Sequence, residues 1–337
     1  MKNISIKDIA LEVGVSTTTV SFVLNGKARE KRISEDLKER ILQTAARLNY
    51  RPNQVARGLR TGQTHTLGLI VEDISNPFFA RLARVVEHEA DKSGYTVMFC
   101  STENNDEKAS SLLYMLRHRQ MDGFILVPTP GMKKDIQEMI VEQKPVVLVD
   151  RYFPDLDTCY VAVDNFNGAH EGVRLLLKKG FKKIGLVTVD SIQVQMQERE
   201  RGFVSALEKK NGKADADQIL RVPYDMSERK TVELIFEFIK KEKGLDALFF
   251  TTNYLGVAGL EALRMAGKKI PSDMGVVCFD DNDLFRLGSP SISVIAQPIS
   301  TIAEKAVALL LGKLTGKEDP GGCHLIISPS VVEREST

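Results

Sequence analysis

Short hydroxyl side chains are concentrated near the start of the chain, in the segment Ser16-Thr-Thr-Thr-Val-Ser21, and Phe22 follows them directly. Hydroxyl groups can donate hydrogen bonds to phosphate oxygens and base edges, and the methyl group of threonine can contact thymine. A basic segment, residues 27–32, comes next and suits phosphate contacts that add affinity without selecting a base sequence. These residue types predict a surface that reads DNA. The alternative is a threonine-rich helix face that only contacts solvent.

The spacing of apolar residues predicts the helices that would position this surface. Within residues 6–13 the apolar residues lie three and four positions apart on one helix face, and Gly14 permits the positive φ that ends the helix. Ser16 can cap a second helix over residues 17–24, and Ser34 can cap a third. Two short helices joined by a tight turn form a helix–turn–helix, whose second helix enters the DNA major groove.

Charge is distributed unevenly along the 337 residues, although the net charge is only +1. Residues 1–60 contain 12 of the 46 Lys and Arg residues and six of the 45 Asp and Glu residues, so this head carries +6 and the remaining residues carry −5. A basic head on a mildly acidic body indicates a polyanion partner for the head alone.

Short apolar runs alternate with helical patterns from residue 66 onward. The predicted strands are Thr66–Val71, Tyr95–Cys100, Gly123–Val127, Val146–Val149, Tyr160–Val163, Lys183–Val187, Ala247–Phe250 and Gly275–Phe279. The predicted helices are Phe79–Ser93, Lys108–Gln120, Gly168–Lys179, Glu198–Lys209, Arg229–Lys241 and Leu255–Ala266. This alternation predicts parallel sheets with helices on both faces, and the number of units predicts two α/β lobes. Ligands of such sheets bind beyond the carboxyl ends of the strands, so we expect a cleft between the lobes.

Enzyme motifs are absent from the sequence: GxGxxG, HExxH, GxSxG and the phosphate-binding GxxxxGK followed by Ser or Thr do not occur. We therefore expect no catalytic residues, and we expect neither a metal nor a cofactor. The four cysteines are far apart, which favours buried free thiols in a reducing compartment; they are Cys100, Cys159, Cys278 and Cys323. Because the sequence has neither a secretory signal nor a membrane-spanning stretch, we expect a cytoplasmic protein without a membrane partner.

Two segments of the head, IKDIALEVGVSTTTVSFVLNG and LNYRPNQVARGLRTG, resemble the DNA-binding domain and hinge of the lactose-repressor (LacI/GalR) family. The phrases GLIVEDISNPFF, DGFILVP, PVVLVDR and IPSDMGVVCFDD resemble that family's sensor, so the resemblance covers essentially the whole chain. It implies an N-terminal all-α helix-turn-helix domain and an α/β sensor of two doubly wound lobes, similar to periplasmic sugar-binding proteins. The implied boundaries are 1–50 for the DNA-binding domain, 51–61 for the hinge helix, 62–161 with 294–323 for lobe one, and 162–291 with 324–337 for lobe two.

The resemblance also implies which residues contact operator DNA. In the family the hinge forms a short helix on the operator, and a leucine, here Leu59, wedges into the minor groove between base steps. Pro52 and Gly58 agree with this, because proline fixes the start of a short helix and glycine keeps it marginal without DNA. The implied DNA-binding residues are Ser5, Ser16, Thr17, Thr18, Thr19, Ser21, Phe22, Asn25, Lys31, Arg32, Tyr50, Asn53, Val55, Ala56, Arg57 and Leu59.

Phe22 departs from the family, which often has a polar or basic residue at this position. Phenylalanine cannot form the bidentate contact to guanine that arginine forms. We therefore expect an apolar contact to a thymine methyl group or a deoxyribose, and a shifted operator preference.

The ligand-binding residues that the resemblance implies are Asp73, Phe78, Phe79, Arg199, Asn253 and Asp280, with Asp150 and Asp164 as weaker candidates. Carboxylates, amides and a guanidinium form paired hydrogen bonds with sugar hydroxyls, and an aromatic face covers the apolar side of a sugar ring.

Several of these residues have structural alternatives. The two phenylalanines could belong to the lobe core, Asp280 could cap a turn, and Arg199 could pair with Glu198 or Glu200. Tyr254 stands where the family commonly has aspartate, and the segment 193–197 is rich in glutamine. Both departures affect the identity of the ligand.

The resulting expectation is a sequence-specific transcriptional regulator, a repressor by resemblance, that binds a palindromic operator as a homodimer. A small-molecule effector, expected to be a sugar, would bind between the lobes and change operator affinity. Four alternatives stay open: a purine effector, a protein co-regulator and, from other classes, a sugar transport receptor or an enzyme carrying a DNA module.

Overall fold

The computed structural model of the chain describes residues 4–50, 62–211, 216–316 and 322–337. The chain divides into two compact units, residues 1–64 and 65–337. Within the described ranges, no helix has the length and apolar character needed to cross a membrane. The expected hinge contacts lie outside the described residues; they are Asn53, Val55, Ala56, Arg57 and Leu59.

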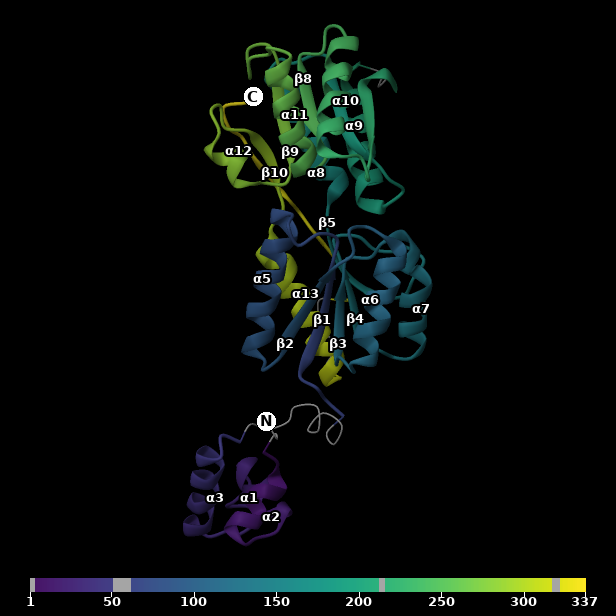
Figure 1. Cartoon of the computed structure of the whole chain (residues 1–337). Coiled ribbons are helices and arrows are strands. Elements are labelled where there is room, and N and C mark those ends of the chain that lie inside the picture. Colours follow the sequence, from purple (N-terminus) through teal and green to yellow (C-terminus); the bar gives the residue numbers. More distant parts are fainter. Residues whose placement is uncertain (1–3, 51–61, 212–215, 317–321) are drawn as a thin grey trace. The chain divides into compact units, whose positions relative to one another are not determined.

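The first unit contains α1 (Ile6–Val13), α2 (Thr17–Leu24) and α3 (Glu35–Arg47) (Figure 1). The predicted ends are confirmed: Gly14 follows α1 with a φ of 77°, and Ser16 accepts a 3.0 Å hydrogen bond from the amide of Thr19. Ser34 caps α3 in the same way. The apolar helix faces meet in a small core around Ile9.

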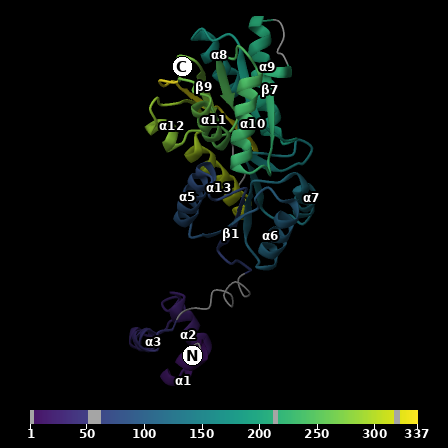
Figure 2. The ribbon, with the colours of Figure 1, turned by 45° about the horizontal axis from the view of Figure 1, so that its top comes forward.

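The first sheet of the second unit contains six parallel strands in the order β11-β5-β4-β3-β1-β2. The strands are β1 (Thr66–Val71), β2 (Thr96–Ser101), β3 (Gly123–Leu126), β4 (Val146–Val149), β5 (Cys159–Val163) and β11 (His324–Ile327). Helices α5 (Pro77–Lys92) and α13 (Ile299–Thr315) lie beside each other on one face (Figures 1 and 2). Helices α6 (Asp106–His118) and α7 (Lys133–Val141), with η1 (Pro130–Met132), cover the other face.

The second sheet repeats this arrangement in the order β12-β10-β9-β8-β6-β7, and only the pair β10–β12 is antiparallel. The strands are β6 (Ile184–Asp190), β7 (Ile219–Pro223), β8 (Ala247–Phe250), β9 (Gly275–Phe279), β10 (Ser293–Ala296) and β12 (Ser330–Val332). The helices are α8 (Asn165–Lys178), α9 (Val194–Asn211), η2 (Ala216–Gln218), α10 (Glu228–Lys241), α11 (Asn253–Met265) and α12 (Asp283–Leu287). Helices α8 and α9 cross closely at Gly202, where a Cβ atom would lie 2.2 Å from the carbonyl oxygen of Phe166.

The two sheets share one doubly wound topology, which confirms the predicted fold class. In each sheet the strand order reverses beside the first strand, β1 in one and β6 in the other. At such a reversal the connecting helices lie on opposite faces, and a crevice opens at the carboxyl ends of the strands. The fold therefore places the ends of β1, β3, β6 and β8 where a ligand is expected.

Strand pairing corrects two of the expected lobe boundaries. The chain passes between the sheets after β5, β10 and β11. β10 pairs with β9 and so belongs to the second lobe, although residues 294–323 were assigned to the first. β11 pairs with β5 in the first lobe, although residues 324–337 were assigned to the second. These strands have four residues each, and runs this short carry no information about their partner strand.

The expectation of four free thiols is wrong for one pair. Cys159 and Cys323 form a disulfide with their Cα atoms 4.5 Å apart, whereas Cys100 and Cys278 are free. Cys159 begins β5, Cys323 precedes the neighbouring β11, and the amide of Tyr160 donates a 2.9 Å hydrogen bond to the carbonyl of Cys323. The two cysteines are 164 residues apart in sequence, so their spacing could not reveal the pairing.

Candidate ligand-binding cleft and DNA-reading helix

Side chains at the carboxyl ends of both sheets surround a cavity of about 40 Å³, which we call the cleft. The first lobe contributes Glu72, Asn76, Phe78, Phe79, Asp150 and Arg151. The second lobe contributes Val189, Gln193, Gln195, Met196, Arg199, Tyr224, Thr252, Tyr254 and Asp280, and Gln297 follows β10. Small-molecule sites usually enclose about 300 Å³ or more. The side chains therefore fill most of the cleft in this arrangement of the lobes.

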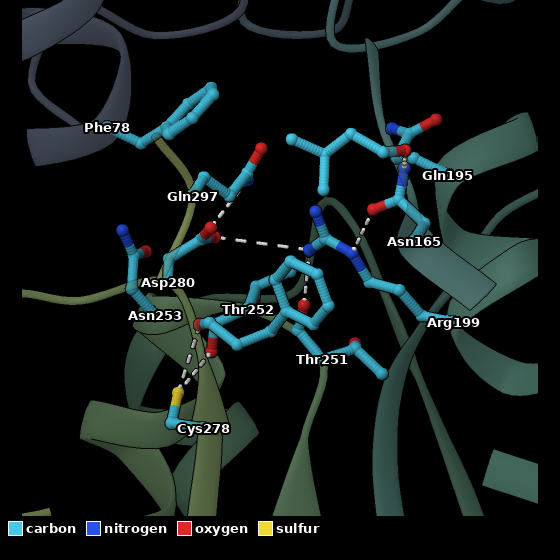
Figure 3. Close-up of polar contacts among 12 residues, drawn as sticks. Phe78, Asn165, Gln195, Arg199, Thr251, Thr252, Asn253, Cys278, Asp280 and Gln297 are labelled. Atoms are coloured by element: carbon cyan, nitrogen blue, oxygen red, sulfur yellow. Dashed lines mark hydrogen bonds and ion pairs between the residues drawn. The ribbon is translucent and has the colours of Figure 1, made fainter. Parts of the chain in front are cut away.

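Arg199 reaches into the cleft from the first turns of α9 and is only 2% exposed. Its Nε donates a 2.8 Å hydrogen bond to Oδ1 of Asn165, and its Nη1 donates a 2.5 Å hydrogen bond to the carbonyl of Thr251 (Figure 3). The guanidinium also covers the ring of Phe279, with Cζ 3.6 Å from the ring centroid. Burial lowers the pKa of Arg199. The Arg199 side chain lines the cleft.

Asp280 directly follows β9 and faces the same guanidinium. Its Oδ2 lies 3.9 Å from Nη1 of Arg199, and its Oδ1 accepts a 2.6 Å hydrogen bond from Gln297 (Figure 3). Burial raises the pKa of Asp280, and the charge of Arg199 offsets part of that effect. The backbone of Asp280 has a φ of 72°, a left-handed conformation that turns the side chain out of the strand line.

A second ion-pair cluster lies in the first lobe. Arg151 follows β4 and forms ion pairs with Glu72 at the end of β1 and with Asp150, the latter at 3.2 Å. On the opposite side of the cleft, burial and the nearby Glu72 raise the pKa of Tyr224. The charged groups lining the cleft sum to one negative charge, because three carboxylates face two guanidinium groups.

Side-chain contacts join the lobes at the cleft and beside it. Asn253 donates a 2.9 Å hydrogen bond to Asn76, the residue that caps α5. Gln193 donates a hydrogen bond of the same length to Asn104, which follows β2. The third contact is an exposed ion pair of 3.1 Å between Arg81 and Asp283. These contacts hold the two lobes together over a nearly filled cleft.

Gln195 has an unsatisfied acceptor in the cleft. The residue is buried in the first turn of α9, and among the described residues its Oε1 has no hydrogen-bond partner. A buried polar atom without a partner costs about 1–3 kcal/mol. A ligand that donates a hydrogen bond to this oxygen would recover that cost.

The structure brings most of the expected ligand residues together. The residues that line the cleft are Phe78, Phe79, Asp150, Arg199 and Asp280. Asn253 does not line it but donates a hydrogen bond to Asn76, which does. The two phenylalanines also belong to the lobe core, as the structural alternative expected. The alternative in which Arg199 pairs with Glu198 or Glu200 is wrong. Glu198 instead pairs with Arg201, and Glu200 pairs with Arg221.

Two of the expected ligand residues have local structural roles. Asp73 accepts hydrogen bonds from the amide and hydroxyl of Ser75 at 2.8 and 2.7 Å, and it does not line the cleft. Asp164 caps α8 by accepting a 3.0 Å hydrogen bond from the amide of Asn167. Both side chains stabilise turns at the strand ends.

Several lining residues were missed from the sequence, although they share a signal that was available. Glu72 follows β1, Arg151 follows β4, Tyr224 follows β7, Thr252 follows β8 and Gln297 follows β10. A polar residue directly after a strand predicts a position at the carboxyl edge of the sheet. Gln193 and Gln195 were noted only as unusual residues and belong to the same edge. In the described part of the chain, no group of three His, Cys, Asp or Glu residues could hold a metal ion.

The expected DNA-contacting side chains of the head are exposed or partly exposed on and around α2. Thr17, Thr18 and Asn25 are exposed, and Thr19, Ser21 and Phe22 are partly exposed. Lys31 lies over the ring of Phe22, with Nζ 5.4 Å from its centroid.

Three of the expected DNA-contacting residues also have structural roles: Ser5 donates a 2.6 Å hydrogen bond to Asp8, Ser16 caps α2, and Asn25 donates a 2.7 Å hydrogen bond to the carbonyl of Ser21. Arg32 is exposed, and Tyr50 packs against the small core.

Residues 5–53 match the model of the bacterial regulatory proteins of the lacI family, and residues 173–337 match the model of a periplasmic binding protein-like domain. The HTH-type transcriptional repressor PurR of Aliivibrio salmonicida is 31% identical over 340 residues, which cover 98% of each chain. The chain belongs to the lacI family of bacterial regulatory proteins. It is a DNA-binding transcriptional regulator, and this family consists of regulators and not of enzymes.

Two further similarities fit this family membership. A ribose operon repressor of Haemophilus influenzae is 29% identical over 333 residues, with 98% of each chain covered. The lac repressor dimer bound to operator and an anti-inducer superposes on this fold with a TM-score of 0.86 at 20% identity, over 99% of each chain.

Proposed function

We propose that this regulator controls operator binding through a neutral sugar held in the cleft between Arg199, Asp280 and Gln195. These three side chains converge from α9 and from the end of β9. They offer a charged donor, a charged acceptor and an unsatisfied amide oxygen within one small volume. A pair of adjacent sugar hydroxyls can donate to the carboxylate and accept from the guanidinium at once.

The single observation that carries this proposal is the uncommitted hydrogen-bonding capacity in the cleft. Within the described residues, Oε1 of Gln195 has no hydrogen-bond partner, although the side chain is buried. Buried polar atoms are almost always paired in folded proteins. A polar ligand is the natural partner for this oxygen, and the buried ring of Phe78, which also lines the cleft, suits the apolar face of a sugar.

The charge of the cleft favours a neutral ligand over a phosphorylated one. Glu72, Asp150 and Asp280 outnumber Arg151 and Arg199, and the two guanidinium groups already face carboxylates. A phosphate group would meet a net negative charge in a low-dielectric site. The name of the ribose operon repressor relative supports a sugar.

A purine is the second candidate ligand. The relative PurR is named for a purine system, and Phe78, Phe79 and Tyr224 surround the cleft with aromatic rings that could stack on a planar base. Asp280 could then accept a hydrogen bond from a ring nitrogen. The two candidates differ in the donor that would form a hydrogen bond to Oε1 of Gln195. A sugar would donate from a hydroxyl group, and a purine would donate from a ring N–H.

Binding would control DNA by changing how the lobes meet. A sugar exceeds the present cavity, so its entry displaces side chains and strains the contacts Asn76–Asn253 and Asn104–Gln193. In a dimer with one head per half-site, this would change how the two heads engage the operator. Coupling of about 1–3 kcal/mol would then change operator affinity several-fold to about 150-fold.

The test is thermal unfolding of the full chain with neutral sugars, sugar phosphates and purine bases, followed by operator binding with each compound that shifts the transition. A ligand at about 100 times its dissociation constant should stabilise the folded state by about 2.7 kcal/mol. The shift should disappear in Asp280→Asn and persist in Arg201→Ala, whose side chain is exposed on the same helix α9. A shift with purines alone would select the second candidate, and a shift that survives Asp280→Asn would place the ligand elsewhere.

A further inference from the structure

The disulfide between Cys159 and Cys323 lies in a protein whose partner is DNA. Bacterial DNA is in the cytosol, where glutathione and thioredoxin keep thiols reduced. Disulfides of that compartment are usually transient bonds that take part in catalysis or in redox sensing. A bacterial regulator with such a bond therefore fits a redox-sensing role better than a permanent structural crosslink.

The disulfide joins two neighbouring strands at the ends where both begin. Cys159 is the first residue of β5, Cys323 directly precedes β11, and the next pair of residues, Tyr160 and His324, is in register. The Cα atoms of the two cysteines are 4.5 Å apart, close to the spacing of about 4.8 Å between neighbouring strands. The sheet therefore keeps both cysteines within bonding reach, and the bond can break and form again without a rearrangement of the strands.

The two cysteines differ in their access to solvent. Cys159 is 5% exposed and belongs to the core, whereas Cys323 is partly exposed, so an incoming thiolate meets Cys323 first. The free cysteines cannot compete for the bond: Cys100 is on β2 at the opposite edge of the same sheet, and Cys278 is buried in β9 of the other sheet. The exchange partner must therefore come from outside the chain.

The two crosslinked strands both lead out of the first lobe. The chain continues from the end of β5 into α8 of the second lobe and from the end of β11 into β12 of the second lobe. These are two of the three places where the chain passes between the lobes. β11 has four residues and is an edge strand whose neighbour in the sheet is β5. Once the disulfide is reduced, only non-covalent contacts hold β11, so the redox state sets how firmly two of the three connections are tied.

A row of stacked rings leads from the crosslinked strands toward the cleft. The ring of His324 stacks on that of Tyr160 with their centroids 4.7 Å apart, and the ring of Tyr160 stacks on that of Tyr152 at 3.9 Å. Tyr152 directly follows Arg151, which lines the cleft and pairs with Glu72. A movement of β11 relative to β5 therefore shifts rings that end beside the ion pairs of the cleft.

We propose that the Cys159–Cys323 pair is a reversible thiol–disulfide switch that low-molecular-weight thiols reduce and their disulfides oxidise, and that its state sets operator affinity. The oxidised bond restrains movement between the lobes, and reduction releases it. The ring row carries the difference to the cleft. The switch acts on the ligand-free protein and so goes beyond the control by a ligand that is proposed above.

Reduction consumes two molecules of a thiol RSH. The thiolate of the first attacks Sγ of Cys323, forms a mixed disulfide and displaces Cys159 as a thiolate. The thiolate of the second attacks the RS sulfur of the mixed disulfide, releases Cys323 as a thiolate and leaves as RSSR. The two protons of the thiols end on the two cysteines, and two electrons pass to the protein. The reverse sequence with RSSR forms the bond again.

The first experiment tests whether the bond is reversible under mild conditions. The full chain is equilibrated with mixtures of reduced and oxidised glutathione and quenched with acid, and its free cysteines are then alkylated and identified by mass spectrometry. We expect Cys159 and Cys323 to pass together from dithiol to disulfide within the range of mixtures. A pair that stays oxidised in reduced glutathione is a structural crosslink, and a pair that stays reduced in oxidised glutathione is no switch. Either result would overturn the proposal.

The second experiment compares the DNA affinity of the two forms without any sugar present. The probes are duplexes that each form of the full chain selects from a random pool at fixed salt. We expect the affinities of the oxidised and reduced wild type to differ about fivefold or more. Cys100→Ser should keep the difference, and Cys323→Ser should bind like the reduced wild type in either mixture. Equal affinities of the two wild-type forms would overturn the switch, whereas failure of the proposed sugar binding would leave this result unchanged.

A matched pair of variants tests the ring row. Tyr160→Leu removes the central ring and should shrink the difference between the oxidised and reduced forms, while the glutathione titration of the cysteines stays as in the wild type. Tyr114→Leu removes an exposed ring from α6 and should keep the full difference. A full difference in Tyr160→Leu would overturn the ring row as the route to the cleft.

Discussion

Asn253 in the second lobe donates a 2.9 Å hydrogen bond from Nδ2 to Oδ1 of Asn76 in the first lobe. The bond links the first turn of α11 to the cap of α5, and Asn76 also accepts a 3.0 Å hydrogen bond from the amide of Phe78. The Asn76 side chain thus contacts both the backbone of the cleft-lining Phe78 and the other lobe. Any ligand that moves Phe78 changes the contact that holds the lobes together.

Replacing Asn253 with alanine should loosen the lobes in the ligand-free protein. The loss of one partly buried hydrogen bond, about 1 kcal/mol, corresponds to about fivefold more frequent opening. Hydrogen exchange of peptides that cover residues 72–80 and 250–256 should speed up accordingly. Asp283→Ala removes the exposed ion pair with Arg81 and should have a smaller effect, because exposed pairs contribute little. Equal effects of the two variants would contradict a special role for Asn253.

Replacing Arg199 with methionine should destabilise the second lobe strongly. The variant leaves Oδ1 of Asn165, the carbonyl of Thr251 and the Asp280 carboxylate without their buried cationic donor. Removal of one member of such a cluster typically costs about 3–5 kcal/mol. The matched variant Arg201→Met, two residues along the same helix and exposed, should cost less than about 1 kcal/mol. Urea unfolding monitored by circular dichroism measures both, and similar costs for the two would contradict the assignment.

The sequence predicted the elements of the fold better than their partners. Long amphipathic helices such as α10 and continuous apolar strands such as β9 follow directly from periodicity. The lobe of β10 and the Cys159–Cys323 disulfide depend on which strand pairs with which, and strand pairing joins segments far apart in sequence. That information is not local, so neither propensity nor spacing could supply it.

The site was predictable in part for the same reason. Arg199 and Asp280 could be assigned because residue type and family motif agree, and the structure places them 3.9 Å apart. Asp73 also matched by motif, but its carboxylate is used by Ser75 in the adjacent turn. Gln195 became a candidate only when its buried oxygen was found without a partner among the described residues. Such an atom is visible only in three dimensions.

The pH dependence of stability should report the buried carboxyl of Asp280. Burial raises the pKa of this group above its ordinary value of about 3.9, so the folded state binds the proton at a higher pH than the unfolded state does. As pH falls from 7 toward 4, the wild type should therefore gain stability relative to Asp280→Asn, which has no proton to bind. Urea unfolding of both proteins at half-unit pH steps measures the difference. A difference that does not change with pH would contradict the raised pKa.

The disulfide should make stability depend on reductant. Closing a chain segment of 164 residues restricts the unfolded state, and loops of this length correspond to roughly 5 kcal/mol in the chain-entropy model. Reductant should lower the urea midpoint of the wild type and of Cys100→Ser, which removes a free thiol, but not that of Cys323→Ser. Thiol titration of the denatured, unreduced wild type should find two reactive cysteines. Four reactive thiols would show that the purified protein carries the pair reduced.

Phe22 should select a base through its apolar ring. It lies partly exposed on α2 beneath Lys31, so an operator that approaches α2 meets an apolar surface with a positive charge above it. Phe22→Arg should shift the preferred base toward guanine at one position of each half-site, since arginine binds guanine O6 and N7 in a bidentate manner. Selection of bound sequences from a random pool at fixed salt measures the preference. Leu11→Arg is the matched control: it adds the same charge at an exposed position of α1, and it should raise affinity for all sequences without changing the preferred base. If Phe22→Arg behaves like this control, Phe22 does not read a base, and the specificity of the head comes from the hydroxyl side chains of α2.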